Sequence, residues 1–278
     1  MIDGVPTERI LAASGRSEVT LAQGLTEGEH TVELYRETES MMGSTHFLGF
    51  TAGTVTGAPA YGGRLIEVIG DSISCGYGNL GSVVHPPWDS GCGYTVETQS
   101  AYQAYSAQLA RLLGAEASIV CRSGWGMYRG GDGNTSSTLP SLFDRALGEQ
   151  SSVTWGFQRQ PEAVLINLGT NDSNTNAGGD PGVAFETSGI DFVATVRARY
   201  PRSWIFLTIG TMTGEPMLTT MNTHIANIVT AAGDPKVSAL NLTTQDVSTT
   251  GCDFHPNVAE DTRIAGALAD PIRVKLGW

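Results

Sequence analysis

The chain has 278 residues, enough to bury one large core or one core plus a small satellite domain, and 40% of them are hydrophobic. It contains no apolar run long enough to cross a bilayer, and no charged, apolar secretory leader is visible at its start, which leaves the compartment open. The net charge of -12, from 28 acidic and 16 basic residues, argues against a nucleic acid as partner, because phosphate backbones bind clustered Lys and Arg.

Residues 1–60 differ from the rest of the sequence. Three strand-like segments, 18–22, 30–37 and 45–51, are separated by glycines, and no helical pattern is present. Three short strands cannot bury two faces by themselves. We therefore expect a β-rich segment that either docks on the larger domain or is part of a bigger β-sandwich, with residues 54–63 as the linker.

From residue 64 onward, strand-like and helical segments alternate, which predicts a parallel sheet with helices on both faces. The strand-like runs are residues 65–69, 117–121, 163–168, 204–209 and 237–242. The helical stretches are residues 100–113, 139–147, 183–199, 216–232 and 258–274. Five strands fit a flavodoxin-like doubly wound α/β domain over residues 61–278 better than a closed eight-stranded barrel.

The run 65–69 leads directly into Gly70-Asp71-Ser72, so a buried strand delivers a serine into a loop. Parallel α/β sheets keep their active sites at such strand ends, and we interpret Ser72 as a candidate nucleophile. The chain has no G-x-S-x-G sequence, which excludes the usual α/β-hydrolase elbow. The same residues also suit an ordinary turn or helix N-cap, and Asp71 fits a loop-bracing role better than that of a catalytic acid.

Two later strand ends offer hydrogen-bond donors for the oxyanion that acyl transfer creates. Gly124 follows the run 117–121 and can present a backbone N–H without obstruction by a side chain. Asn171 follows the run 163–168 and can point an amide donor to the same place. Losing one such donor costs roughly 3 kcal/mol of barrier. A tight turn at Gly124 and an Asx-turn at Asn171 are the structural alternatives.

The general base must be one of five histidines. His255 lies between the last strand and the last helix, from where it can reach over the carboxyl edge of the sheet. A neutral imidazole there can take the Ser72 proton and return it to the leaving group. We expect structural or solvent-exposed roles for the other four, which are His30, His46, His85 and His224.

Gly70-Asp71-Ser72, Gly124, Asn171 and His255 match, in order, the four sequence blocks of the SGNH (GDSL-type) hydrolases. The chain more closely resembles the second carbohydrate esterase family, whose members remove acetyl groups from xylan and other plant polysaccharides. The similar segments are residues 69–78, 123–129, 166–172 and 251–257, together with residues 28–34 and 47–50, which are similar to the end of that family's N-terminal jelly roll. This implies a partial jelly roll over residues 1–60 and an SGNH fold beyond it.

The resemblance implies Ser72 as nucleophile, His255 as base, and an oxyanion hole made of the Ser72 and Gly124 backbones with Asn171. The superfamily usually places an aspartate three residues before the histidine, but that residue here is Cys252. Asp253, two residues before it, could reach the imidazole in an extended segment. Alternatively, a backbone carbonyl could orient the ring and leave a Ser-His dyad.

Flat aromatic rings can stack on a sugar, and Trp125, Trp155 and Phe254 lie in or near the motifs. Phe254 is the best candidate for a substrate platform, whereas core packing is an equal alternative for Trp155. Trp125 stands where the family resemblance leads us to expect a smaller or basic residue, which predicts a shifted substrate preference.

The four cysteines are too few for a disulfide scaffold and show no paired zinc-ligand spacing. We expect Cys75 and Cys121 to be small buried apolar side chains. Cys92 and Cys252 lie in glycine-containing or polar loops, and the sequence leaves open whether they form a disulfide, which would imply an oxidising compartment.

Together these patterns predict a serine esterase that deacetylates carbohydrates through an acetyl-enzyme, with an acetylated carbohydrate as partner and with neither metal nor cofactor. An SGNH lipase or thioesterase acting on other short acyl esters is the first alternative. A carbohydrate-binding protein without catalysis is the second. The resemblance favours secretion, and the oligomeric state is left open.

Overall fold

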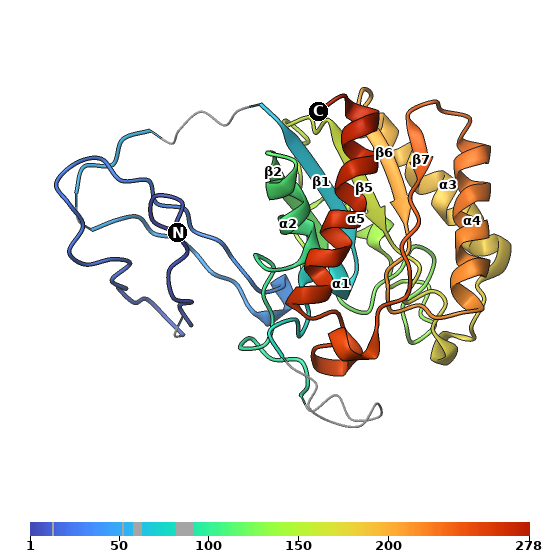
Figure 1. The fold of residues 1–278 in the computed structure, drawn as a ribbon, viewed down its shortest axis with the longest axis horizontal. Coiled ribbons are helices and arrows are strands. Elements are labelled where there is room, and N and C mark those ends of the chain that lie inside the picture. The colour runs from blue at the N-terminus through green and yellow to red at the C-terminus, as the bar shows by residue number, and fades with distance from the viewer. Residues whose placement is uncertain (13, 52, 58–62, 82–91) are drawn as a thin grey trace.

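The computed structural model describes residues 1–12, 14–51, 53–57, 63–81 and 92–278. The strands of its central sheet are β1 (Leu65–Gly70), β2 (Glu116–Cys121), β5 (Ala163–Asn167), β6 (Trp204–Thr208) and β7 (Val237–Ala239). They pair in parallel in the order β2-β1-β5-β6-β7, which is the flavodoxin-like order (Figure 1). The predicted doubly wound five-stranded sheet is therefore confirmed.

Two helices cover each face of this sheet. They are α2 (Tyr105–Leu112) and α5 (Val258–Leu276) on one face, and α3 (Gly182–Arg199) and α4 (Met217–Ala232) on the other. In β1, Ile66 and Val68 pack in the layer of α2 and α5, whereas Ile69 packs in the layer of α3 and α4. All of β1 is buried, which is why every residue of this strand except Glu67 is apolar. Within the described residues, no helix has the length and apolar character that a membrane crossing requires.

The strand order reverses between β1 and β5, because the chain passes from β1 to β2 on one side and returns to β5 on the other. Ligands bind outside the carboxyl ends of the strands at such a reversal. Short helices occupy the connecting segments: α1 (Ser72–Cys75), and the 3-10 helices η1 (Ser40–Met42), η2 (Leu139–Ser141), η3 (Thr175–Ala177), η4 (Val247–Thr249) and η5 (Cys252–Phe254).

The helix predicted over residues 139–147 is wrong. The chain forms η2 and then a two-stranded antiparallel ribbon of β3 (Arg145–Leu147) and β4 (Gln150–Thr154). Leu139, Leu142 and Phe143 are buried at one-turn spacing, which imitates a helix in the sequence. The pattern ends there, because the residues of β3 and β4 that follow are mostly exposed.

The strands predicted at residues 18–22, 30–37 and 45–51 are also wrong. Among the described residues before 58, the only β pairings are isolated bridges of Ile2 with Val5 and Val32. A strand needs a neighbour for its backbone N–H and C=O groups, and in the described part of the chain these largely exposed segments have none beyond the bridge of Val32 with Ile2. In Figure 1 they run as extended blue loops beside the β2 edge of the sheet. The division at residues 60 and 61 stays a prediction, since residues 58–62 of the linker lie outside the described residues.

Candidate active site

Ser72 is the first residue of α1, immediately after the carboxyl end of β1. The side chain of Asp71 caps this short helix by accepting from the backbone N–H of Ile73 at 3.1 Å, which is the loop-bracing role expected of it. Burial, with a smaller contribution from the nearby Asp172 carboxylate, raises the pKa of the Asp71 carboxyl to about 7. The cap therefore fixes Ser72 at the strand end with its side chain almost entirely buried.

His255 meets Ser72 across the edge of the sheet. Its Nε2 atom lies 2.7 Å from Ser72 Oγ, and its Nδ1 atom lies 3.0 Å from the backbone oxygen of Asp253. A carbonyl oxygen only accepts, so Nδ1 carries the proton and Nε2 is free to accept from the serine hydroxyl. Burial lowers the pKa of the His255 imidazole to about 4, which keeps the ring neutral at ordinary pH. A neutral acceptor beside a hydroxyl is the arrangement that general-base catalysis requires.

Asp253 does not lie in the extended segment that the sequence analysis considered. It has φ 48° and ψ 39° within η5, so its carbonyl rather than its carboxylate turns towards the imidazole. The carboxylate accepts from the Tyr77 hydroxyl at 2.5 Å. The Tyr77 ring in turn stacks on His255 with 4.1 Å between ring centroids and 28° between planes. The geometry thus matches the alternative in which a backbone carbonyl orients the ring.

Two further donors lie near Ser72, Gly124 in the turn after β2 and Asn171 in the loop after β5. Gly124 has φ 78°, a left-handed conformation that glycine adopts without strain. Among the described residues, neither the backbone N–H of Gly124 nor that of Ser72 has a hydrogen-bond partner. Asn171 Nδ2 lies 3.0 Å from the backbone oxygen of Trp125 and 3.5 Å from Asp71 Oδ2, so it bridges the two loops. The predicted donors Ser72, Gly124 and Asn171 are therefore brought to one place.

Asp172 is a residue that the sequence analysis did not single out. Its buried carboxylate accepts from the backbone N–H groups of Met127 at 2.9 Å, Tyr128 at 2.7 Å and Arg129 at 3.0 Å. Gly126 permits this close approach, because a Cβ there would lie 2.3 Å from Asp172 Oδ2. Asp172 therefore fixes the exit of the Gly124 turn. Its only signal in the sequence was its position beside Asn171.

Two of the three aromatic candidates lie near the site. Phe254 is exposed beside His255, and its backbone oxygen accepts from Gln245 Nε2 at 2.6 Å. Trp125 follows Gly124, is half-buried against the core, and has the Arg122 guanidinium 5.4 Å from its ring centroid. Both rings can therefore contact a ligand that reaches Ser72.

Trp155 lies in another part of the fold, at the end of β4, and its assignment to substrate binding stays a prediction. Its backbone N–H donates to the Asp144 carbonyl at 2.7 Å, and its indole lies near the Tyr200 hydroxyl, which donates to Glu67 at 3.0 Å. Glu67 lies three residues before the carboxyl end of β1, roughly 10 Å away at about 3.3 Å per residue. Trp155 directly follows β4, the second strand of the ribbon.

Two disulfides join segments around the site. Cys92 and Cys252 are bonded with 4.9 Å between Cα atoms, which settles the pairing that the sequence left open. Cys75 and Cys121 are bonded as well, with 5.6 Å between Cα atoms. The expectation that they are free apolar side chains is wrong, because parallel pairing of β1 with β2 brings Cys121 opposite Gly70, close to the start of α1.

The other histidines are away from Ser72. His224 lies 2.9 Å from Asp180 and 2.7 Å from Glu186, between α3 and α4. His30 bonds to Asp3 at 2.7 Å, His46 is exposed, and His85 lies outside the described residues. These positions fit the structural or solvent-exposed roles expected for His30, His46 and His224.

Two family descriptions match the chain. Residues 1–59 match "Carbohydrate esterase 2 N-terminal", and residues 68–259 match "GDSL-like Lipase/Acylhydrolase family". The second match spans the segments that carry Ser72, Gly124, Asn171 and His255.

Curated proteins with similar sequences have related names. The chain is 34% identical over 285 residues to the cellulase/esterase CelE of Acetivibrio thermocellus, a match that covers 100% of this chain and 34% of CelE. The chain therefore spans about a third of that relative. It is 25% identical over 289 residues to an acetylxylan esterase / glucomannan deacetylase of Cellvibrio japonicus, covering 100% of this chain and 76% of that protein.

A solved structure gives the comparison in three dimensions. A family two carbohydrate esterase from Clostridium thermocellum, in complex with cellohexaose, matches with a TM-score of 0.75 and 33% identity, over 83% of this chain and 70% of that one. The similarity in sequence and in fold therefore extends over most of both chains. The protein thus belongs to the family two carbohydrate esterases, within the GDSL-like lipase/acylhydrolase family.

Proposed function

We propose that this protein is a serine esterase that removes acetyl groups from carbohydrates. The observation that carries the proposal is the 2.7 Å contact between His255 Nε2 and Ser72 Oγ, with Nδ1 directed to a carbonyl so that Nε2 is the acceptor. A serine hydroxyl is a weak nucleophile until such a base takes its proton. The N–H groups of Ser72 and Gly124, which have no partner among the residues that the structure describes, support the same reaction.

In the proposed reaction, Ser72 Oγ attacks the acetyl carbonyl carbon and its proton passes to His255 Nε2. The carbonyl oxygen becomes an oxyanion that accepts from the Ser72 and Gly124 backbones and from Asn171. When the intermediate collapses, the bond to the sugar oxygen breaks and the imidazolium protonates that oxygen. Water, deprotonated by His255, then attacks the acetyl-serine, and acetate leaves as the Ser72 hydroxyl re-forms.

We propose that the base works in a Ser-His dyad. The Asp253 carbonyl holds the Nδ1–H, and Tyr77 supports the ring face, so the imidazole is oriented without a carboxylate bonded to it. The partial negative charge of the carbonyl oxygen stabilises the imidazolium that forms transiently. Asp253 contributes its backbone to the base and its side chain to Tyr77.

The proposed substrates are acetylated polysaccharides or sugars. Supporting this, one relative is named an acetylxylan esterase / glucomannan deacetylase, and the exposed ring of Phe254 beside the base can stack on a pyranose. Trp125, on the opposite loop, can contact a neighbouring sugar. A site of this kind places the acetyl ester between Ser72 and the oxyanion donors while the sugar stays at the surface.

The test is release of acetate from acetylated xylan, acetylated glucomannan and simple acetyl sugars, compared between wild type and Ser72→Ala. We expect hydrolysis by the wild type and a loss of at least about 10³-fold in the variant. Faster hydrolysis of longer acyl esters than of acetyl esters would instead favour a lipase-like or thioesterase-like enzyme. Binding of the same polysaccharides without any acetate release would favour a carbohydrate-binding protein.

A further inference from the structure

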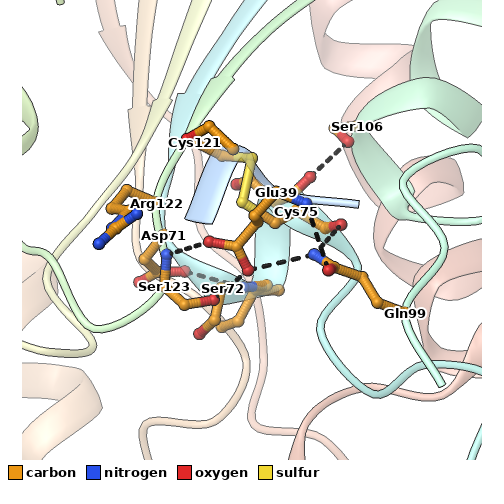
Figure 2. Close-up of a disulfide and its surroundings, with 12 residues drawn as sticks. Glu39, Asp71, Ser72, Cys75, Gln99, Ser106, Cys121, Arg122 and Ser123 are labelled. Carbon is orange, nitrogen blue, oxygen red and sulfur yellow. Dashed lines mark hydrogen bonds between the residues drawn. A yellow bond between two sulfur atoms is a disulfide. The ribbon is translucent and has the colours of Figure 1, made fainter. Parts of the chain in front are cut away.

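Glu39, in the N-terminal segment, places a buried carboxylate against the turn that carries Gly124. Its side chain is nearly inaccessible, with 5% of the residue surface exposed. Glu39 Oε2 accepts from the backbone N–H of Ser123 at 2.7 Å, and Oε1 accepts from the Ser123 hydroxyl at 2.5 Å. The two residues are 84 positions apart in the chain, and Figure 2 shows the carboxylate between Ser123 and Gln99.

Two more donors complete the surroundings of this carboxylate. Gln99 Nε2 and the Tyr94 hydroxyl each donate to Glu39 Oε1 at 3.1 Å. Gln99 also accepts from the Glu39 backbone N–H at 3.3 Å and donates to the Cys75 carbonyl at 3.2 Å. All four of these donors are neutral groups. Burying a carboxylate among neutral groups is costly, so a simple packing role would be served better by an apolar side chain.

The contact between Glu39 and Ser123 matters because Ser123 lies between the last backbone bond of β2 with β1 and the turn at Gly124. Arg122 donates its backbone N–H to Gly70 at 3.2 Å, which is the last ladder bond of β2 with β1. One residue later Glu39 holds Ser123, and Gly124 then turns with φ 78°. On the exit side, Asp172 holds the three backbone N–H groups of residues 127–129. Two buried carboxylates thus clamp the turn, and within the described part of the chain the Gly124 N–H is left without a partner.

Glu39 also reaches the base through a stack of rings. Tyr94, which donates to Glu39, stacks on Tyr77 with 4.5 Å between ring centroids and 7° between planes. Tyr77 stacks on His255 with centroids 4.1 Å apart. One carboxylate therefore touches both the entry of the oxyanion turn and the column of rings behind the histidine.

We propose that Glu39 is a positioning residue for catalysis, which aims the Gly124 backbone N–H at the oxyanion through its two hydrogen bonds to Ser123. The N-terminal segment then belongs to the catalytic unit and is more than an appended domain. This inference rests on the proposed function of Ser72 and Gly124. It assigns no chemical step to Glu39, which acts only through Ser123 and Tyr94.

The direct test is Glu39→Gln, which keeps the side-chain shape and replaces one acceptor oxygen by an amide donor. That amide cannot accept from the Ser123 backbone N–H or from Gln99 Nε2, so in either orientation residue 39 loses at least one of the bonds that hold it against the turn. With p-nitrophenyl acetate, we expect kcat to fall by about ten- to a hundredfold, part of the loss that follows complete removal of an oxyanion donor. KM should change by less than about twofold, because the Gly124 N–H stabilises the oxyanion of the transition state and not the ground-state ester.

The matched control is Glu37→Gln, two residues earlier in the same segment. Glu37 accepts from the Ser100 hydroxyl at 2.7 Å and pairs with Arg9, and it has no bond to Ser123. The Glu37→Gln variant should weaken a comparable contact between the N-terminal segment and the rest of the protein, and its kcat should stay at the wild-type value. A boronic acid that forms a tetrahedral adduct at Ser72 gives a second readout. Its inhibition constant should rise with Glu39→Gln by the same factor as kcat/KM falls, which a loss of stability alone would not produce.

The outcomes separate this inference from the proposed function. An active wild type, an inactive Ser72→Ala and a fully active Glu39→Gln with unchanged boronate inhibition would overturn the role of Glu39 only. A wild type without esterase activity would overturn the proposed function itself. If Glu39→Gln does not fold, Ser123→Ala decides instead. It removes the hydroxyl bond to Glu39, and an unchanged kcat would contradict the inference, whereas a several-fold lower kcat at unchanged KM would support it.

Discussion

The imidazole of His255 is oriented by the backbone of Asp253, with 3.0 Å between Nδ1 and the carbonyl oxygen, and not by the carboxylate of the same residue. That carboxylate bonds to the Tyr77 hydroxyl at 2.5 Å. Asp253 therefore supports His255 in two ways. Its carbonyl accepts from the imidazole, and its carboxylate accepts from Tyr77, whose ring stacks on His255. Variants of Asp253 can therefore test the effect of its side-chain charge on catalysis separately from the effect of its backbone carbonyl.

Replacing Asp253 by Asn should leave most of the activity. Asn tolerates the left-handed backbone at this position, keeps the carbonyl and can still accept from Tyr77. We expect kcat/KM for p-nitrophenyl acetate to fall less than about tenfold, against roughly 10⁴-fold when a triad carboxylate is replaced by its amide. A loss close to the larger figure would show that the carboxylate orients or stabilises the imidazolium directly.

The pH dependence of kcat/KM should follow the protonation of the buried His255 imidazole. Because burial lowers the pKa of His255 to about 4, the proton-accepting form persists well below neutral pH. We expect kcat/KM to stay constant from pH 7 to about 5 and to be halved near the pKa of about 4. An activity that halves near the ordinary histidine value of about 6.5 would contradict this prediction.

The same histidine links pH to stability, so the profile needs a folding control. The pKa of the unfolded imidazole exceeds the folded one, so the unfolded state binds more protons, and the free energy of unfolding decreases as pH falls from about 6.5 towards 4. Tryptophan fluorescence at each pH, on the same samples, would separate loss of fold from protonation of the base.

Removing the ring of Phe254 should affect carbohydrate substrates selectively. Phe254→Asn is suited to the positive φ of 60° at this position and deletes the proposed platform. We expect kcat/KM for acetylated xylan fragments to fall roughly three- to tenfold, the value of one aromatic contact. The same variant should hydrolyse p-nitrophenyl acetate at the wild-type rate, and an equal loss on both esters would mean that the ring supports His255 instead.

The Cys75–Cys121 disulfide should contribute substantially to stability. It closes a loop with a sequence separation of 46 residues, for which the chain-entropy model gives about 4 kcal/mol. The double variant Cys75→Ser with Cys121→Ser should lower the free energy of unfolding by about this amount in urea titrations. A midpoint equal to that of the wild type would show that the unfolded chain is not constrained by this link.

Asp172→Asn should loosen the Gly124 turn. The amide group cannot accept from all three backbone N–H groups that now bond to the carboxylate, which leaves a buried donor unpaired. We expect the free energy of unfolding to fall by about 3 kcal/mol, with lower kcat. Asp132→Asn, an exposed substitution in the following loop, is the control and should change stability by less than about 0.5 kcal/mol.

Much of the sheet could be predicted because its strands are buried on both faces. The runs at β1, β5 and β6 are almost entirely apolar, and each is followed within three residues by glycine and polar residues. Parallel strands end at one edge, so Ser72, Gly124 and Asn171 could be placed together before any contact was known. His255 followed from its position between the last strand and the last helix.

Other features depend on contacts that no local pattern records. Glu39 is one of many acidic residues in an extended segment, and only the folded chain brings it to Ser123. The left-handed backbone at Asp253 occurs at a residue other than glycine, so the turn that reverses its carbonyl and carboxylate had no signal. Cys75 and Cys121 resemble buried apolar residues in sequence, and their pairing depends on the register of β1 with β2.

The clamp on the oxyanion turn has a consequence for where this protein can be divided. The sheet begins with β1, so a shortened chain that starts at Arg64 would keep every strand of the sheet, the serine and the histidine. It would lack Glu39, and Ser123 would face water where it now meets a carboxylate. Chimaeras that exchange the first 60 residues between relatives therefore exchange part of the catalytic apparatus, and a productive crossover point lies upstream of Glu39 or requires an acidic residue at the equivalent position.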